Sequence, residues 1–333
     1  MRYILALVFC YMACVASAQE WEDQRLFGAE DARVTLRVLS STDTALMAKV
    51  LQDFTNQNQD VAVAYFVAGT SYIDKAFRRA PAEFDIVISS AMDLQFKLAN
   101  DGFARPIPEV SYPGWAQWRR SVFAFTSEPA TIVVNRAAFA QGSVPPTRQA
   151  LIQTLRENAD RFRGRVGTYD VRRSGLGYLF ATQDARTSET YWRLMEVMGN
   201  LDARLYCCSG DMIEDVADGT IFVAYNVLGS YAQARADLAD KIDIIAPTDF
   251  QTIMMRTVLV SDQSAHLAEA QSFLSHVLNQ AQSASAGVDL PPLDLAADAS
   301  EQSSIALEPS LLTYLDRLKS RRFLREWVNA VIQ

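Results

Sequence analysis

Hydroxyl-bearing residues and glycines recur in this chain at one kind of position, between a β-rich run and the start of a helix. Four junctions share this pattern: residues 34–43, 86–90, 166–175 and 205–211. The first turn of a helix has unpaired backbone N–H groups at the positive end of the helix dipole, so such junctions suit anionic ligands. Several junctions directed into one crevice would form a binding site rather than a catalytic one.

The alternation of strands and helices predicts how these junctions are brought together. Residues 45–54 follow a helical hydrophobic period, and residues 61–67 form a β-rich run. This alternation favours a mostly parallel sheet, which binds ligands at the carboxyl ends of its strands. A strand at residues 130–135 has no helix directly before it, and we expect it to cross into a second domain. Residues 257–260 are the expected return crossing.

Capping patterns predict where several helices begin. Ser90 is expected to cap the helix that follows it, and Asp211 and Glu214 have the spacing of a capping box. We expect an extended loop over residues 280–304 and one terminal helix over residues 311–331.

The composition predicts one large α/β unit or two domains. Half of the 333 residues are hydrophobic, which excludes a disordered chain. The formal net charge of −8 argues against binding to nucleic acid or to an acidic membrane surface. It does not argue against a small anion held in a local positive pocket.

The first 18 residues are typical of a secretory signal peptide. Arg2 supplies the positive charge, residues 3–15 the apolar core, and residues 16–18 the small-residue cleavage site. We expect cleavage after Ala18 and a periplasmic location. Because Arg2 is the only charged residue removed, the formal net charge changes from −8 to −9. The apolar run is too short to predict a membrane span.

Two of the four cysteines lie in the predicted signal peptide, and the other two, Cys207 and Cys208, are adjacent. Neighbouring Cα atoms are about 3.8 Å apart, which is closer than ordinary disulfides favour. We therefore expect two thiols near a loop, with a vicinal disulfide or a redox role as the open alternative. No metal site is expected, since His266 and His276 lie far along the chain.

Several of these segments, taken in order, resemble a known protein family. The segments are residues 39–43, 84–93, 210–226 and 315–327. They resemble the periplasmic solute-binding proteins whose two lobes are joined by a hinge. Within that family they are most similar to the ferric, phosphonate and sugar-phosphate binders, a group that includes phosphoglycerate transport regulatory proteins. The resemblance covers residues 34–278.

The resemblance implies an α/β type II fold, with two lobes that are each a mixed, mostly parallel sheet with flanking helices. It implies that hinge motion closes the lobes on a ligand. The implied divisions are a signal peptide at 1–18, a first lobe at 33–128 plus 257–280, a second lobe at 129–256, an extended loop at 281–307, and a C-terminal helix at 308–333 packed on a lobe.

The implied function is binding, not catalysis, and needs no cofactor or metal. A monomer would capture a small anionic, phosphorylated metabolite. It would then deliver this ligand to an inner-membrane ABC importer or report it to a membrane sensor kinase.

Matching positions predict a ligand site with walls from both lobes. In the first lobe, Ser41 and Thr42 are expected to offer hydroxyl and backbone N–H groups. Thr70 and Ser90 are expected to complete that wall. Each of these residues also has a purely structural interpretation, as a helix cap.

In the second lobe, we expect Ser174 and Gly175 at a helix start and Tyr225 and Asn226 after a strand. Arg173 is the expected countercharge, because a guanidinium pairs with phosphate in bidentate fashion. Asp211 is expected to accept a hydrogen bond from a hydroxyl or amine of the ligand.

Two other functions stay open. The first is ferric-ion binding, although ferric binders of this group typically present two adjacent tyrosines, and Tyr225 is followed by Asn226. The second is a secreted phosphoester hydrolase, although the chain has no G-x-S-x-G motif and both histidines lie in one late helix. Residues 175–180 begin like a dinucleotide-binding fingerprint but lack its third glycine.

Overall fold

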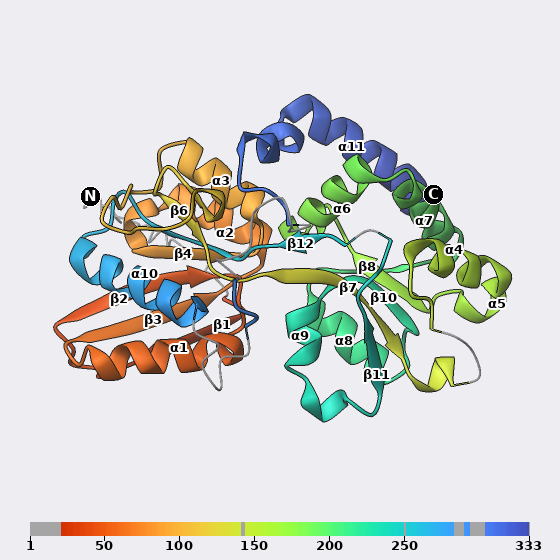
Figure 1. Cartoon of the computed structure of the whole chain (residues 1–333), viewed down its shortest axis with the longest axis horizontal. Helices are drawn as coiled ribbons and strands as arrows, with labels where there is room; N and C mark the ends of the chain where they lie inside the picture. The colour runs from red at the N-terminus through yellow and green to blue at the C-terminus, as the bar shows by residue number, and fades with distance from the viewer. Residues whose placement is uncertain (1–20, 141–143, 250, 283–289, 294–303, 333) are drawn as a thin grey trace, which may run out of the picture.

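The computed structural model describes residues 21–140, 144–249, 251–282, 290–293 and 304–332. These residues form two lobes, which lie side by side in Figure 1, each built around its own β-sheet. The first sheet has seven strands and the second has six. The predicted α/β fold with two lobes is confirmed.

The centre of the first sheet is parallel, which places the carboxyl ends of two central strands side by side. Ser40 lies opposite Ile88 where these two strands, β2 and β4, pair. The edge strand β1 lies before residue 33, where the first lobe was expected to begin. It was missed because only Phe27 of its five residues is buried, so it has no hydrophobic run. The strand order is β1 (Asp23–Phe27), β3 (Val61–Val67), β2 (Val34–Ser40), β4 (Ile86–Ser89), β13 (Thr257–Val260), β6 (Val122–Ala124) and β5 (Gln117–Trp118).

Helices cover both faces of the first sheet. Because successive side chains of a strand point to opposite faces, Val38 packs with α1 and α10, while Leu39 packs with α2 and α3. The helices are α1 (Thr44–Gln57), α2 (Thr70–Arg79), α3 (Met92–Asn100) and α10 (Leu267–Gln282), with 3₁₀ turns η1 (Pro81–Glu83) and η2 (Gly114–Ala116).

The second sheet is mixed and is also covered on both faces. Its strand order is β11 (Ile242–Ile245), β7 (Glu128–Asn135), β10 (Val223–Leu228), β8 (Val166–Tyr169) and β9 (Arg204–Tyr206), and β12 (Ile253–Met254) pairs with β7. Helices α4, α5 and α7 pack on one face and α8 and α9 on the other, while α6 contributes to both hydrophobic clusters. The helices are α4 (Arg148–Glu157), α5 (Ala159–Phe162), α6 (Gly175–Thr187), α7 (Thr190–Asn200), α8 (Ser209–Ala217) and α9 (Gly229–Gln233), with 3₁₀ turns η3 (Ala137–Phe139) and η4 (Ala236–Leu238).

The chain passes between the sheets at residues 125–127 and 255–256. The strands predicted at 130–135 and 257–260 are present, but they lie inside the second and the first sheet respectively, so each crossing comes just before them. Of the loop predicted over residues 280–304, residues 283–289 and 294–303 lie outside the described residues.

The C-terminal segment is not one helix, as predicted, but a 3₁₀ helix η5 (Pro309–Leu315) followed by α11 (Arg317–Val331). Asp316 separates them because its carboxylate accepts hydrogen bonds from the backbone N–H groups of Leu318 and Lys319, which starts a new helix. Helix α11 packs against α7 of the second lobe, whereas η5 contacts α3 of the first, and Figure 1 shows this segment lying over both lobes.

Candidate functional site

A cavity of about 610 Å³ lies between the two lobes. The first lobe lines it with residues at the start of β1, at the end of β3, and directly after β2, β3 and β4. The second lobe lines it with residues from β8, the start of α6, the start of α8, and the end of β10 with α9. The lining residues are Glu22, Asp23, Ser41, Asp43, Thr44, Ala45, Val67, Ala68, Gly69, Thr70 and Ser90 from the first lobe, and Tyr169, Ser174, Leu176, Cys207, Cys208, Ser209, Gly210, Asp211, Leu228 and Tyr231 from the second.

Two predicted site residues, Ser41 and Ser90, meet in the first wall. The backbone N–H of Ser90 donates to Ser41 Oγ at 3.0 Å, and the two hydroxyl oxygens are 3.3 Å apart. Their meeting follows from the parallel pairing of β2 with β4. Ser90 is not the predicted helix cap, because Ala91 occupies that position and its N–H bonds to Ser89 Oγ.

Thr70 of the first lobe touches the second lobe directly. Its Oγ1 accepts hydrogen bonds from the N–H groups of Gly175 at 2.9 Å and Leu176 at 3.1 Å, at the start of α6. Ser174 caps the same helix by accepting from Gly177 N–H, as its position before the helix predicts. A Cβ on Gly175 would lie only 3.0 Å from Thr70 Oγ1, so glycine permits this close approach. Gly175 itself contacts Thr70 without lining the cavity.

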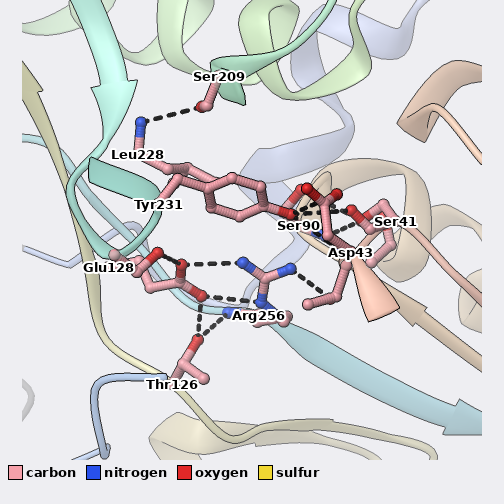
Figure 2. Close-up of polar contacts among 12 residues, drawn as sticks. Ser41, Asp43, Ser90, Thr126, Glu128, Ser209, Leu228, Tyr231 and Arg256 are labelled. Atoms are coloured by element: carbon pink, nitrogen blue, oxygen red, sulfur yellow. Dashed lines mark hydrogen bonds and ion pairs between the residues drawn. The ribbon is translucent and has the colours of Figure 1, made fainter. Parts of the chain in front are cut away.

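Tyr231 forms a second link across the cavity. Its hydroxyl donates to Asp43 Oδ1 at 3.2 Å and accepts from the Asp43 N–H at 3.3 Å. Figure 2 shows the ring of Tyr231 alongside the guanidinium of Arg256, whose Cζ lies 5.9 Å from the ring centroid, with the hydroxyl directed toward Asp43.

Arg256 lies behind Tyr231 at a crossing between the lobes and is fully buried with Glu128. Its Nε and Nη2 each lie 2.9 Å from a carboxylate oxygen of Glu128, which also accepts from Thr126 and Ser230 (Figure 2). Burial alone would raise the pKa of Glu128, but the charge and hydrogen bonds of Arg256 hold it below its usual value. Thr42, a predicted ligand residue, is buried against Arg256 and does not line the cavity.

Four carboxylates line the cavity: Glu22, Asp23, Asp43 and Asp211. Partial burial and the nearby charges of Asp43 and Asp211 raise the pKa of Glu22, although the N–H of Gly69 opposes this. Partial burial also raises the pKa of Asp43, together with Asp211 and Asp23, against the opposing effects of Tyr231 and Arg256. Among the described residues that line the cavity, none is Lys, Arg or His.

Asp211 lines the cavity but is not the start of a capping box. Helix α8 begins earlier than predicted, with Cys208 as its cap residue, so Asp211 lies in the first turn. Its Oδ2 is 3.5 Å from Cys207 Sγ.

Three other predicted site residues lie away from the cavity lining. Arg173 is exposed and outside it. Tyr225 and Asn226 are buried in the second lobe, where the Tyr225 hydroxyl and the Asn226 amide both donate to Asp184, at 2.9 and 3.0 Å.

Cys207 and Cys208 are joined by a disulfide rather than present as the expected thiols. Both line the cavity at the start of α8. In the part of the chain that the structure describes, they and Asp211 form the one group of metal-ligand side chains close enough to share an ion. Because the two sulfur atoms are bonded to each other, they are not available as the thiolates that bind metals.

Sequence reasoning missed Glu22, Asp23, Asp43 and Tyr231 as cavity residues. The signal for Asp43 was present, since it directly follows Thr42 in the first junction. Glu22 and Asp23 sit at an unpredicted edge strand, and Tyr231 reaches the cavity from a helix one turn after β10. Within the described ranges, no helix combines the length and hydrophobicity that crossing a membrane requires.

Comparison with solved structures gives matches over nearly the whole chain. The substrate-binding protein of an ABC transporter from Agrobacterium tumefaciens is 29% identical with a TM-score of 0.85, and the match covers 93% of this chain and 98% of that one. The periplasmic binding protein AfuA from Actinobacillus pleuropneumoniae, with fructose-6-phosphate bound, is 13% identical with a TM-score of 0.69, covering 90% and 99%. Iron-bound HitA from Pseudomonas aeruginosa is 14% identical with a TM-score of 0.63, covering 89% and 99%. The last two show a shared fold alone.

Curated protein sequences give no match. A family model described as bacterial extracellular solute-binding protein matches residues 26–303, which is most of the chain. Together with the two-lobed fold, this match confirms the resemblance stated from the sequence. The chain belongs to the bacterial extracellular solute-binding protein family.

Proposed function

We propose that this protein captures a small solute in the cavity between its lobes and delivers it to an ABC permease in the inner membrane. The observation that carries this proposal is that a single cavity of about 610 Å³ takes its walls from both lobes. This volume lies within the range of ordinary small-molecule sites.

Contacts around the cavity support a closing motion. Thr70 and Tyr231 each make hydrogen bonds from one lobe to the other, while residues 125–127 and 255–256 connect the sheets. Opening about these crossings would break the two contacts and expose the cavity, and a bound solute would favour the closed arrangement.

The anionic, phosphorylated ligand expected from the sequence remains a second candidate. The observation in its favour is the start of α8, where Ser209 and Gly210 line the cavity at the positive end of the helix dipole. The predicted countercharge, Arg173, does not line the cavity, so this candidate has less support than its sequence pattern suggested.

The other sequence hypotheses have little support from the site. For a ferric site, Tyr225 lies outside the lining and is bonded to Asp184. For a hydrolase, the described lining offers no histidine to act as a base for its serines. We retain the proposal of a monomer, cleaved after Ala18 and exported to the periplasm, with a sensor kinase as the alternative partner.

A thermal-shift screen of the chain from Gln19 tests capture in the cavity. The solutes would be phosphoglycerates, sugar phosphates, phosphonates, dicarboxylates, amines and ferric ion. A solute that binds only the folded state raises stability by about 2.7 kcal/mol at a hundredfold excess over Kd. A panel in which no solute shifts the melting temperature contradicts the proposal.

A steric block locates the binding. Gly210 lines the cavity, and a Cβ added there meets no atom within 4 Å, so Gly210→Trp should fold and fill the cavity. Gly114→Trp is the matched control, because a Cβ on Gly114 also meets no atom within 4 Å and Gly114 is outside the lining. The shift should vanish in Gly210→Trp and persist in Gly114→Trp. If the melting-temperature shift persists in both variants, the solute binds outside this cavity.

A further inference from the structure

The cavity wall is negatively charged, unlike the anion site that the sequence predicts. Its four carboxylates come from three separate parts of the chain and from both lobes, with Glu22, Asp23 and Asp43 in the first and Asp211 in the second. None of the described residues in the lining has a cationic side chain to balance them.

Two arginines near the cavity are already paired with acids of the chain. Arg256 lies alongside the ring of Tyr231 and is fully buried in its pair with Glu128 (Figure 2). Arg172 pairs with Asp170, its Nη2 lying 2.7 Å from Asp170 Oδ2. Each guanidinium therefore has an acidic partner of its own, although the charge of Arg256 still acts on Asp43.

Three of the helix starts at the cavity, those of α2, α1 and α8, are also compensated by the chain's own acids. The N–H of Gly69, the cap residue of α2, bonds to Glu22. Thr44, the first residue of α1, donates its hydroxyl to Asp23 Oδ2 at 2.5 Å. Asp211 lies in the first turn of α8. A negative side chain near a helix N-terminus offsets the positive potential there, so these three helix starts attract an anion less strongly.

The acids also act on each other across the two lobes. The charge of Asp211 raises the pKa of both Glu22 and Asp43, which belong to the other lobe. This repulsion is strongest when the lobes are in contact, because it grows as the charges approach. A cation held between them would remove the repulsion and favour closure, whereas an anion would add to it.

We propose that the solute is an organic cation whose protonated amine lies between Asp211 of one lobe and Glu22 and Asp43 of the other. This inference rests on the proposed function, since it names the ligand class of the same cavity. An organic cation fits better than a metal ion because the carboxylates are spread along the walls. Among the described residues, Glu22, Asp23 and Asp43 form no group close enough to share one ion.

Three four-carbon probes with matched chains test the charge directly: 1,4-diaminobutane, butane-1,4-diol and succinate, with inorganic phosphate as a further anion. Each would be titrated calorimetrically into the chain from Gln19, with the melting temperature measured in parallel. We expect the diamine to bind and stabilise the protein, and the diol, succinate and phosphate to do so much less. Binding of succinate or phosphate in preference to the diamine would overturn the cationic ligand while leaving solute capture intact.

Neutral variants of the acids locate the amine. Asp211→Asn and Glu22→Gln should each weaken diamine binding by about 10- to 100-fold, as expected for the loss of a charged hydrogen bond. Asp240→Asn is the matched control, because Asp240 is exposed in the second lobe and outside the lining. Equal weakening in all three variants would show a non-specific charge effect, and weakening in none would show that these acids do not bind the amine. Either result would overturn the proposal. Absence of heat and stabilisation with every probe, the diamine included, would also overturn it.

Discussion

The carboxyl group of Asp93 in the first lobe is buried and has a raised pKa. It lies in the first turn of α3 and is only 3% exposed. Burial raises its pKa to about 7, although the hydrogen bond that it accepts from Leu94 N–H opposes this rise. In the unfolded chain an aspartate has a pKa of about 3.9. The folded protein therefore holds a proton that the unfolded chain releases, and this stabilises the fold at low pH.

The stability of the protein should consequently fall as the pH rises from about 4 to about 7, to the extent that Asp93 contributes. Asp93→Asn keeps the side chain neutral at every pH. Relative to the parent, we expect it to raise the free energy of unfolding by about 2–4 kcal/mol at pH 8 and to change it little at pH 4. Urea denaturation at the two pH values measures this. The same difference at both values would show that Asp93 is not the titrating group.

At the residue scale, the sequence located some cavity residues and misplaced others for a physical reason. Ser41, Ser90 and Ser174 line the cavity because strand ends and helix starts fix where a residue lies. Arg173 follows the same junction logic, but its long side chain is exposed, and its direction depends on packing that the sequence does not reveal. The acidity of the wall was not predictable, since it arises where three distant segments meet.

At the scale of elements, boundaries depend on which polar group completes a helix start. Thr147 and Ser174 cap α4 and α6 as their positions before those helices indicate. Ser90 and Asp211 do not cap, because Ala91 and Cys208 hold those positions. Residue type alone does not separate these cases, since Ser and Asp favour both the cap and the neighbouring positions.

Asp316 gives the clearest test of a cap. Its Oδ1 accepts from the N–H groups of Leu318 and Lys319, each at 3.1 Å, and so begins α11. Asp316→Ala should lower the free energy of unfolding by about 0.5–2 kcal/mol. Asp60→Ala, in the exposed turn between α1 and β3, is the control and should change stability little. Equal losses in the two variants would mean that the break in the C-terminal segment does not depend on this cap.

At the scale of the molecule, the two lobes and the family could be inferred from the order of the junctions, because alternating strands and helices leave few ways to build a sheet. The position of each crossing could not be fixed to the residue. Strands β7 and β13 are hydrophobic runs, and such a run looks the same in the sequence whether it connects the two lobes or lies inside one sheet. Arg256 in one crossing pairs with Glu128, the first residue of β7 directly after the other crossing, and this buried pair joins positions 128 residues apart.

The most direct test of solute capture between the lobes is small-angle X-ray scattering from the chain beginning at Gln19, with and without a solute that stabilises it. Thr70 and Tyr231 join the lobes in this structure, and opening the cavity would break both contacts. If a solute favours the closed arrangement, as we propose, the radius of gyration should be smaller with solute. Gly210→Trp should show no compaction with the same solute. Identical scattering with and without a solute that binds the parent protein would contradict capture by closure of the two lobes.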